Sequence, residues 1–259
     1  MAKQSGMGDR LYLNGYNVSG DVGSVGRIGG GPALLDVTAI DKSAIERIGA
    51  LQSGEISFVS YFNDGWASSR AGAAGTLFHQ LSGLPTTDVQ LIYCRGTTLG
   101  NRGAGLVARQ VGYDLNRGAD GALTFSAQAL SRGYPLEWGV QLTPGQRQDT
   151  SATAAGAGNS VDDLAGSPVS TAFGWSAYLQ VFSFTGTSCT VSIHDSADNS
   201  TFAAISGAAF TAATGVTFER IQAASSTATV RRYLAVNTAG TFTECTFAVL
   251  FVRNRTATL

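Results

Sequence analysis

Two stretches of alternating side chains, joined by a short polar loop, constrain this chain more than any other feature. In the first stretch the larger apolar residues share one parity: Val107, Val111, Tyr113 and Leu115. Small or polar residues hold the other parity: Ala108, Gln110, Gly112 and Asp114. The second stretch alternates in the same way, with Leu123, Phe125 and Ala127 against Thr124, Ser126 and Gln128. A period of two is typical of β-strands, and the loop 116–121 has the Gly, Asn and Asp of a hairpin turn. The pattern in residues 104–130 therefore predicts a long β-hairpin, with one face of apolar side chains and one face of small or polar side chains.

The charge content of the chain is low, and burial of surface in an assembly is one way to accommodate it. Only 14% of its 259 residues are charged, against about 25% in an average soluble domain. A surface so poor in charge is well suited to burial between subunits. The formal net charge of −1 means that the chain has no excess of positive charge with which to bind nucleic acid. No apolar run approaches the ~20 residues of a membrane helix, and the N-terminal residues lack an apolar signal segment, so we expect a protein made in a reducing cytoplasm.

The chain as a whole reads as mainly β, with 33 Gly and short alternating runs. We expect residues 1–33 to be a flexible N-terminal arm, either disordered or ordered against a neighbour. Residues 34–145 form a first domain, with short helices predicted at 43–51 and 73–84. The small polar stretch 146–170 reads as a linker. Five strand-like runs in 171–259 predict a C-terminal β-sandwich, Ig-like or jelly-roll-like.

No group of residues resembles a complete active site. His79 and His194 have no nucleophile context. Asp162 and Asp163 stand next to each other in the predicted linker, and we expect both carboxylates to be solvated, without a catalytic role. Residues 195–202 are acidic but lack the spacing of a calcium loop, so a tight turn is favoured over a metal site. We therefore expect no enzyme, no metal and no cofactor.

The three cysteines, Cys94, Cys189 and Cys245, are far apart and form no CxxC motif. Cys189 and Cys245 could pair with each other. Small buried thiols in the core are the favoured interpretation.

A family resemblance covers roughly the first 145 residues. It rests on the order of seven short runs: LDVT at 35–38 with IERI at 45–48, GEISFVSYFN at 54–63, HQL at 79–81 with LP at 84–85, DLNRGADGALTF at 114–125, and LEWG at 136–139. In this order the chain resembles the tail tube proteins of long-tailed bacteriophages. The second half looks like the β-sandwich domains that decorate many phage structural proteins.

This resemblance implies a β-barrel or sandwich flanked by a helix. Its copies would assemble into rings, commonly hexameric, that stack into a hollow tube through which DNA leaves the virion. It also implies contacts with other tail proteins, passage of DNA without sequence reading, and no membrane. The polar face of the hairpin would line the lumen: Gln110, Asp114, Thr124, Ser126 and Gln128. The apolar face would pack on the domain: Val107, Val111, Tyr113, Leu123 and Phe125. Three arginines are expected at subunit boundaries: Arg109, Arg102 and Arg117.

Two other readings remain open. The chain could be a capsid decoration or tail-tip protein whose C-terminal sandwich binds host glycan, with Phe173, Trp175 and Tyr178 stacking on sugars. It could also be a glycan hydrolase, but the sequence lacks the context of a catalytic carboxylate pair.

Overall fold

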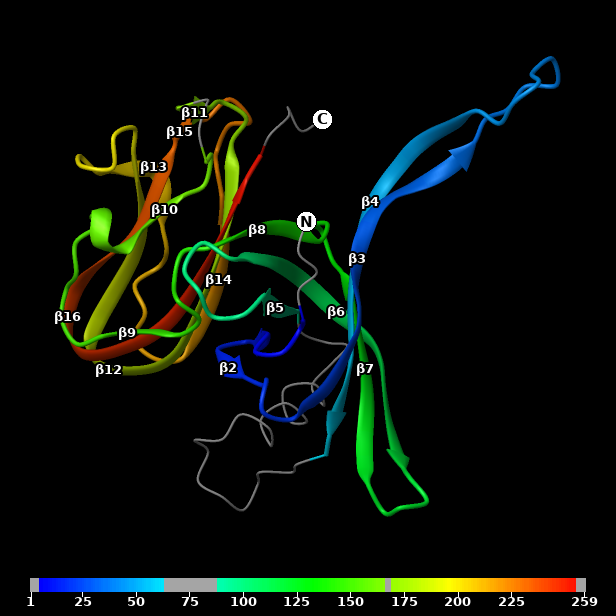
Figure 1. Cartoon of the computed structure of the whole chain (residues 1–259), viewed down its shortest axis with the longest axis horizontal. Coiled ribbons are helices and arrows are strands. Elements are labelled where there is room, and N and C mark those ends of the chain that lie inside the picture. Colours follow the sequence, from blue (N-terminus) through cyan, green and yellow to red (C-terminus); the bar gives the residue numbers. More distant parts are fainter. Residues whose placement is uncertain (1–4, 63–87, 166–168, 255–259) are drawn as a thin grey trace. The chain divides into compact units, whose positions relative to one another are not determined.

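The computed structural model describes residues 5–62, 88–165 and 169–254, in which strands make up almost all of the regular structure (Figure 1). The prediction of a mainly β protein is confirmed. The one helical element in the described part is a single 3₁₀ turn, η1 (Ala157–Asn159). No helix in that part is long and apolar enough to cross a membrane.

The chain divides into two compact units whose boundaries differ from those expected. Unit 1 combines three segments: Met1–Gly20, Gln90–Gly105 and Trp138–Leu259. Unit 2 combines Asp21–Val89 and Leu106–Glu137. The N-terminal residues, which we expected to be a flexible arm, instead supply the short strands β1 (Arg10–Leu13) and β2 (Tyr16–Asn17) to unit 1. They also supply the long strand β3 (Val22–Asp36) to unit 2.

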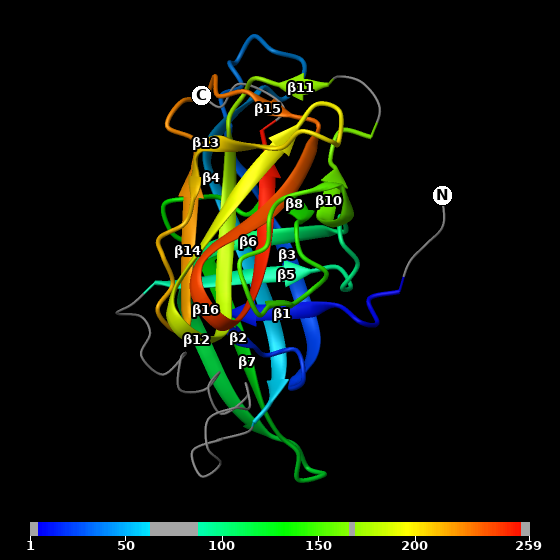
Figure 2. The same ribbon diagram turned by 90° about the vertical axis from the view of Figure 1, so that its left-hand side faces the viewer.

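Two long strands organise unit 1. β12 (Trp175–Ser196) and β16 (Tyr233–Arg253) pair antiparallel from Trp175↔Arg253 to Ser196↔Tyr233, and Figure 2 shows them side by side. On one side of them lies β13 (Ala203–Ala209). On the other side, next to β16, the sheet continues with β8 (Glu137–Gln141), the start of β6 (Arg102–Arg117), β5 (Val89–Cys94), β1 and β2. β14 (Thr217–Gln222) also pairs with β12, and β11 (Ser170–Thr171) pairs with β15 (Val230–Arg231).

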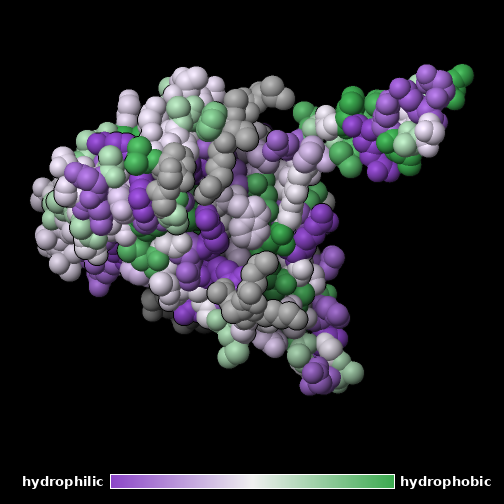
Figure 3. Space-filling model, turned by 45° about the horizontal axis from the view of Figure 1, so that its top comes forward, coloured by the Kyte–Doolittle hydropathy of each residue, from purple (hydrophilic) through white to green (hydrophobic). Residues whose placement is uncertain are grey.

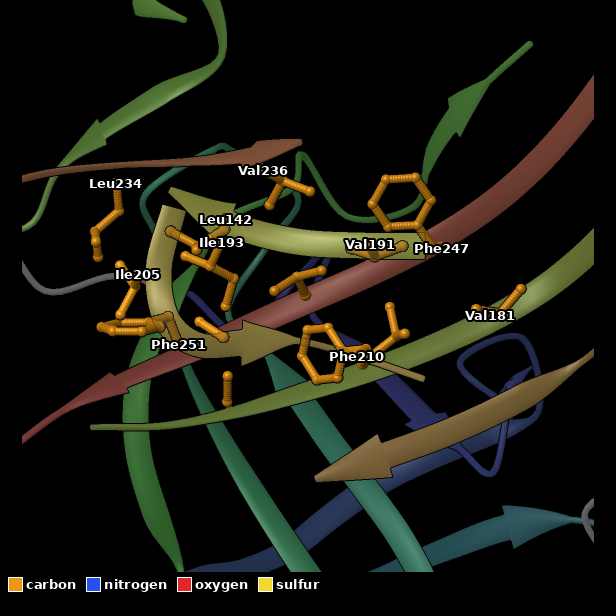
Figure 4. Close-up of a cluster of buried hydrophobic side chains, with 14 of the residues drawn as sticks. Leu142, Val181, Val191, Ile193, Ile205, Phe210, Leu234, Val236, Phe247 and Phe251 are labelled. Atoms are coloured by element: carbon orange, nitrogen blue, oxygen red, sulfur yellow. The ribbon is translucent and has the colours of Figure 1, made fainter. Parts of the chain in front are cut away.

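The core of unit 1 is built where these strands face each other. Alternate side chains of β12, such as Val191 and Ile193, meet Val236, Phe247 and other residues of β16 in one buried cluster (Figure 4). A buried amide joins the distant segments of the unit. The side chain of Gln180 accepts from the backbone N–H of Gly15 at 3.0 Å and donates to the carbonyl of Gln90 at 3.0 Å. The C-terminal strands therefore share one body with N-terminal residues.

The expected linker at 146–170 also contributes to this body. β9 (Arg147–Asp149) and β10 (Ser160–Asp162) both pair with β16. The reading of Asp162 and Asp163 as a solvated pair is wrong for Asp163. Its carboxylate is buried and lies 2.6 Å from the guanidinium of Arg253. Small, polar composition marked the segment as a linker, but backbone hydrogen bonds to β16 need no large side chains.

Unit 2 is an antiparallel sheet in the order β3-β4-β7-β6, with β4 (Arg47–Tyr61) and β7 (Leu123–Ser131) inside. The helix predicted at 43–51 is wrong. β3 and β4 pair as far as Asp36↔Arg47, so those residues form a hairpin loop and the start of β4. A nine-residue helix is marginal in water, whereas here Leu35 faces Ile48 across the hairpin. The second predicted helix, at 73–84, lies outside the described residues.

Candidate assembly surface

The four-stranded sheet of unit 2 has one buried face. Its members alternate along the two inner strands as the period of two requires: Ile56, Phe58 and Ser60 on β4, and Phe125, Ala127 and Ala129 on β7. β4 and β7 are in register, with Ile56 opposite Ala129 and Phe58 opposite Ala127. The sequence prediction placed Phe125 on such a face. Leu123, from the same predicted set, is 39% exposed near the hairpin turn.

The opposite face of the same sheet is polar and carries little charge. Ser126 and Gln128 are exposed and Thr124 is half-buried. Across the pair, exposed Asp114 stands opposite Ser126. Ion pairs among the described residues of this sheet include Arg27 Nη1 with Glu55 Oε2 at 3.3 Å and Arg109 Nε with Asp88 at 3.0 Å. The amide of Gln128 donates to Glu55 at 2.9 Å. Four of the five predicted lumen residues thus belong to one face of the β6–β7 hairpin.

A β-bulge in β6 changes which residues face which side. The register shifts between Gln110 and Gly112, so that Gln110 pairs with Ala129 and Gly112 with Gln128. One extra residue in a strand moves every following side chain to the other face. Before the bulge Leu106 and Ala108 are fully buried and Val107 is only half-buried. The single parity expected through Val107, Val111 and Tyr113 is therefore interrupted. The side chains of Gln110, Val111 and Tyr113 lie outside the described residues.

The three arginines expected at subunit boundaries have different surroundings. Arg109 Nε lies 3.0 Å from the carboxylate of Asp88, which also binds Arg132 within the same unit. The hydrogen bond from Arg132 is the main reason that the pKa of Asp88 lies below its usual value. Arg102 lies 3.9 Å from Asp163 and keeps more than half of its side chain exposed. Arg117 is exposed at the end of β6. Their predicted role between subunits stays a prediction.

The end of the β3–β4 hairpin is the surface that sequence reasoning missed. We call residues 32–52 the apolar arm. There β4 pairs with β3 alone, because its pairing with β7 covers only Glu55 to Tyr61. Large apolar side chains of this arm are exposed: Leu34, Leu35, Val37, Ile40, Ile45, Ile48 and Leu51. Figure 3 shows them in green at the upper right, among polar neighbours. Large exposed apolar patches mark interaction sites. Three of these residues, Ile45, Ile48 and Leu51, have the spacing of a helix, and this concealed the patch.

The residues considered for chemistry are held in structural roles. The backbone N–H and guanidinium of Arg231 bind Asp195 at 2.7 Å. The carboxylate of Asp198 accepts from the N–H groups of Ser200 and Thr201, which lower its pKa. Burial lowers the pKa of His194. No cluster that could hold a metal occurs in the described part of the chain, and His79 lies outside it.

The positions of the aromatic residues considered for glycan binding argue against that role. Trp175 and Tyr178 are fully buried, so neither ring is available for stacking on a sugar. Phe173 is partly exposed. The indole of Trp175 packs against Phe251, with ring centres 5.9 Å apart, inside the core of unit 1.

Comparison with known proteins finds only distant structural similarity. The sequence matches no protein-family model, and no curated protein matches it. Among solved structures, a chain from the virion of a native gene transfer agent particle has a TM-score of 0.39 and 16% identity, covering 52% of this chain and 98% of that chain. The SPP1 Dit protein, described as a paradigm of the hub adsorption apparatus of phages that infect Gram-positive bacteria, has a TM-score of 0.32 and 12% identity. That alignment covers 94% of this chain and 98% of that chain. A chain of the phage P2 baseplate has a TM-score of 0.32 and 9% identity, with coverages of 96% and 99%.

Proposed function

We propose that this chain is a structural, non-catalytic protein of a phage tail, whose copies associate into rings that stack as a tube. The observation that carries the proposal is the sheet of unit 2. Its outer strands are β3, which is 15 residues long, and the part of β6 from Ala108 to Arg117 that pairs with β7, and these form the two edges of the order β3-β4-β7-β6. Long edge strands present unpaired backbone groups that another strand can satisfy.

Joining β3 of one copy to β6 of the next gives a head-to-tail contact. Such heterologous contacts close into a ring when the rotation between copies permits it. The resemblance in sequence to tail tube proteins implies six copies. The polar face of the sheet, with Asp114, Thr124, Ser126 and Gln128, then lines the channel. A wall with few cations suits DNA passage, because dense Lys or Arg would bind phosphates and hold the DNA back.

The apolar arm supplies the contact between rings in this proposal. Seven large apolar side chains on one hairpin end are costly to leave in water, at about 25 cal/mol per Å² of apolar surface. A matching surface on the next ring would bury them. Other tail proteins would meet the two ends of the tube, and the protein would reside in the virion tail.

Electron microscopy of the purified full chain at rising concentration tests the proposal. We expect tubes of constant diameter for the natural sequence. The double variant Ile40→Glu with Leu51→Glu changes two side chains that are 109% and 89% exposed, so the fold should survive while stacking fails. Val169→Glu, at 60% exposure in unit 1, is the matched control and should still form tubes. A natural chain that stays monomeric at every concentration, or arm variants that form the same tubes, would contradict the proposal.

A further inference from the structure

The apolar arm joins the sheet of unit 2 where three segments of the chain cross. β3 reaches the crossing at Gly30, β4 at Gly54, and the segment before β8 at Leu136. A Cβ at Gly30 would lie 2.3 Å from the carbonyl oxygen of Ser53, and a Cβ at Gly54 would lie 2.4 Å from the backbone nitrogen of Leu136. The backbones are therefore packed so closely that only glycine fits at these two positions.

Hydrogen bonds hold the sheet side of this crossing. β4 pairs with β7 as far as Glu55↔Leu130, and the N–H of Gly54 then donates to Ser131 Oγ at 2.8 Å. In the described part of the chain, β4 has no strand partner but β3 beyond this point. A two-stranded ribbon twists more than a wide sheet and is marginally stable by itself. The base of the arm is thus fixed, whereas the arm is supported by a single pair of strands.

Two irregularities follow directly on the arm side of the crossing. Gly31 has φ +152°, which side chains other than glycine rarely adopt, and a Cβ there would meet no atom within 4 Å. The register with β4 then shifts between Pro32 and Leu34, and such a bulge bends a strand pair and interrupts its ladder. Across this stretch Ser53 Oγ donates to the carbonyl of Gly31 at 3.3 Å, which is long for a hydrogen bond.

We propose that the apolar arm is hinged. It swings as a unit about Gly31 and the adjoining bulge, while the glycine crossing keeps its base in place. Ile40 is nine residues beyond Gly31, which corresponds to about 30 Å in an extended strand. A rotation of about 20°, similar to the angle between neighbouring strands of a twisted sheet, moves the end of such an arm by about 10 Å.

The two faces of the arm explain what the hinge would do. Leu35 lies opposite Ile48, and Val37 continues the same face because side chains alternate along a strand. Asp36 and Arg47 lie opposite each other on the other face. Rotation at the hinge lets the apolar face turn toward a second copy of the chain, and binding then fixes the arm in one orientation. This role rests on the proposed stacking of rings, whereas the motion itself does not depend on it.

Pulsed electron paramagnetic resonance on the full chain, at a concentration where it is monomeric, tests the hinge. Spin labels on Ile40→Cys and Ser126→Cys report the distance from the end of the arm to the sheet. Labels on Arg27→Cys and Thr124→Cys both lie on the sheet and form the control pair. The three natural cysteines are buried and free, and the natural chain gives the background labelling. We expect the distances of the arm pair to spread over up to about 10 Å more than those of the control pair.

Two glycine variants locate the motion. Gly31→Ala disfavours the φ of +152° without creating a clash, so it should shift the mean distance of the arm pair and leave the control pair unchanged. Gly49→Ala, within the arm, is the matched control, because its Cβ would lie 3.6 Å from Pro32 in ordinary contact. It should change neither distance.

Three results would overturn the hinge. One is an arm pair in the free chain whose distances are as narrowly distributed as those of the control pair. Another is a Gly31→Ala variant in which the arm pair is unchanged, and the third is a variant in which both pairs shift equally.

The hinge and the tube can fail separately. A broad distribution in a chain that never forms tubes would support the hinge and remove its role in stacking. A narrow distribution in a free chain that does form tubes would support stacking and remove the hinge. If both hold, the distances of the arm pair should become narrower when tubes form.

Discussion

Breaking the buried ion pair between Asp163 and Arg253 should destabilise unit 1 strongly. Asp163 Oδ2 lies 2.6 Å from Arg253 Nε, and the two side chains are 3% and 2% exposed. The guanidinium also donates to Thr171 Oγ1 at 3.0 Å, and to the carbonyls of Val230 and Arg231 at 2.7 Å each. In Asp163→Ala, Arg253 keeps these three hydrogen bonds but loses the charge that balances its own.

The neighbouring residue provides the control. Asp162 pairs with Arg232 at 2.6 Å, but those side chains are 34% and 24% exposed. Leaving a buried charge without its partner costs about 3–5 kcal/mol, whereas an exposed pair contributes about 0–1 kcal/mol. For a unit of this size, each kcal/mol shifts the Tm by about 2–4 °C. Asp163→Ala should therefore lower the Tm by about 6–20 °C, and Asp162→Ala by about 4 °C at most.

Thermal unfolding, followed by tryptophan fluorescence at a concentration where the chain is monomeric, measures the Tm of both variants. The double variant Asp163→Ala with Arg253→Met removes the charge together with its partner, so it should be more stable than Asp163→Ala alone. Equal losses of stability for Asp162→Ala and Asp163→Ala would refute the reasoning, because burial would then have no influence. A double variant less stable than the single one would show that the three remaining hydrogen bonds of Arg253 matter more than its charge.

Three further predictions concern close packing and pH. Gly139→Ala should destabilise the fold by about 3 kcal/mol or more in urea unfolding, because its Cβ would lie 2.1 Å from the carbonyl oxygen of Phe251. Gly156→Ala meets no atom within 4 Å and should change stability by less than about 0.5 kcal/mol. Burial, with a hydrogen bond to a carboxylate, raises the pKa of Tyr93 to about 12. Because an unfolded tyrosine ionises near pH ~10, the free energy of unfolding should fall between pH 10 and 12, and Tyr93→Phe should reduce that fall. Burial lowers the pKa of His194, so the unfolded chain takes up its proton first as the pH drops below ~6.5. Stability should decrease from pH 7 to pH 5, and His194→Asn should flatten this dependence.

Local patterns were enough to predict the strands that make the polar face. The alternation in residues 104–130 predicted a hairpin, and β6 and β7 do pair from Ala108↔Ser131 to Arg117↔Leu123. The loop glycines predicted its turn, where Gly121 has φ +89°. These features depend on neighbours within a few residues, so the sequence displays them directly.

Features set by a single residue or by distant partners could not be predicted in this way. The bulge between Gln110 and Gly112 adds one residue, and an alternation that includes small residues hides the addition. The hairpin end around Leu35 and Ile48 has apolar spacing that a helix and a strand pair both satisfy. The partner of Asp163 is 90 residues away in the chain, and only the folded unit reveals it.

The low charge content of the chain and its exposed surfaces are related. Several of its few carboxylates are paired within the fold: Asp88, Asp149, Asp162, Asp163 and Asp195 each bind an arginine. On the surfaces proposed for assembly, opposite charges also lie close together: Arg27 with Glu55 on the sheet of unit 2, and Lys42 with Glu46 in the apolar arm, each at 3.3 Å. Like charges on adjoining copies would oppose close association, whereas nearly neutral edges and an apolar hairpin end do not. Internal pairing of charge and outward exposure of apolar surface therefore both suit the association of copies that we propose.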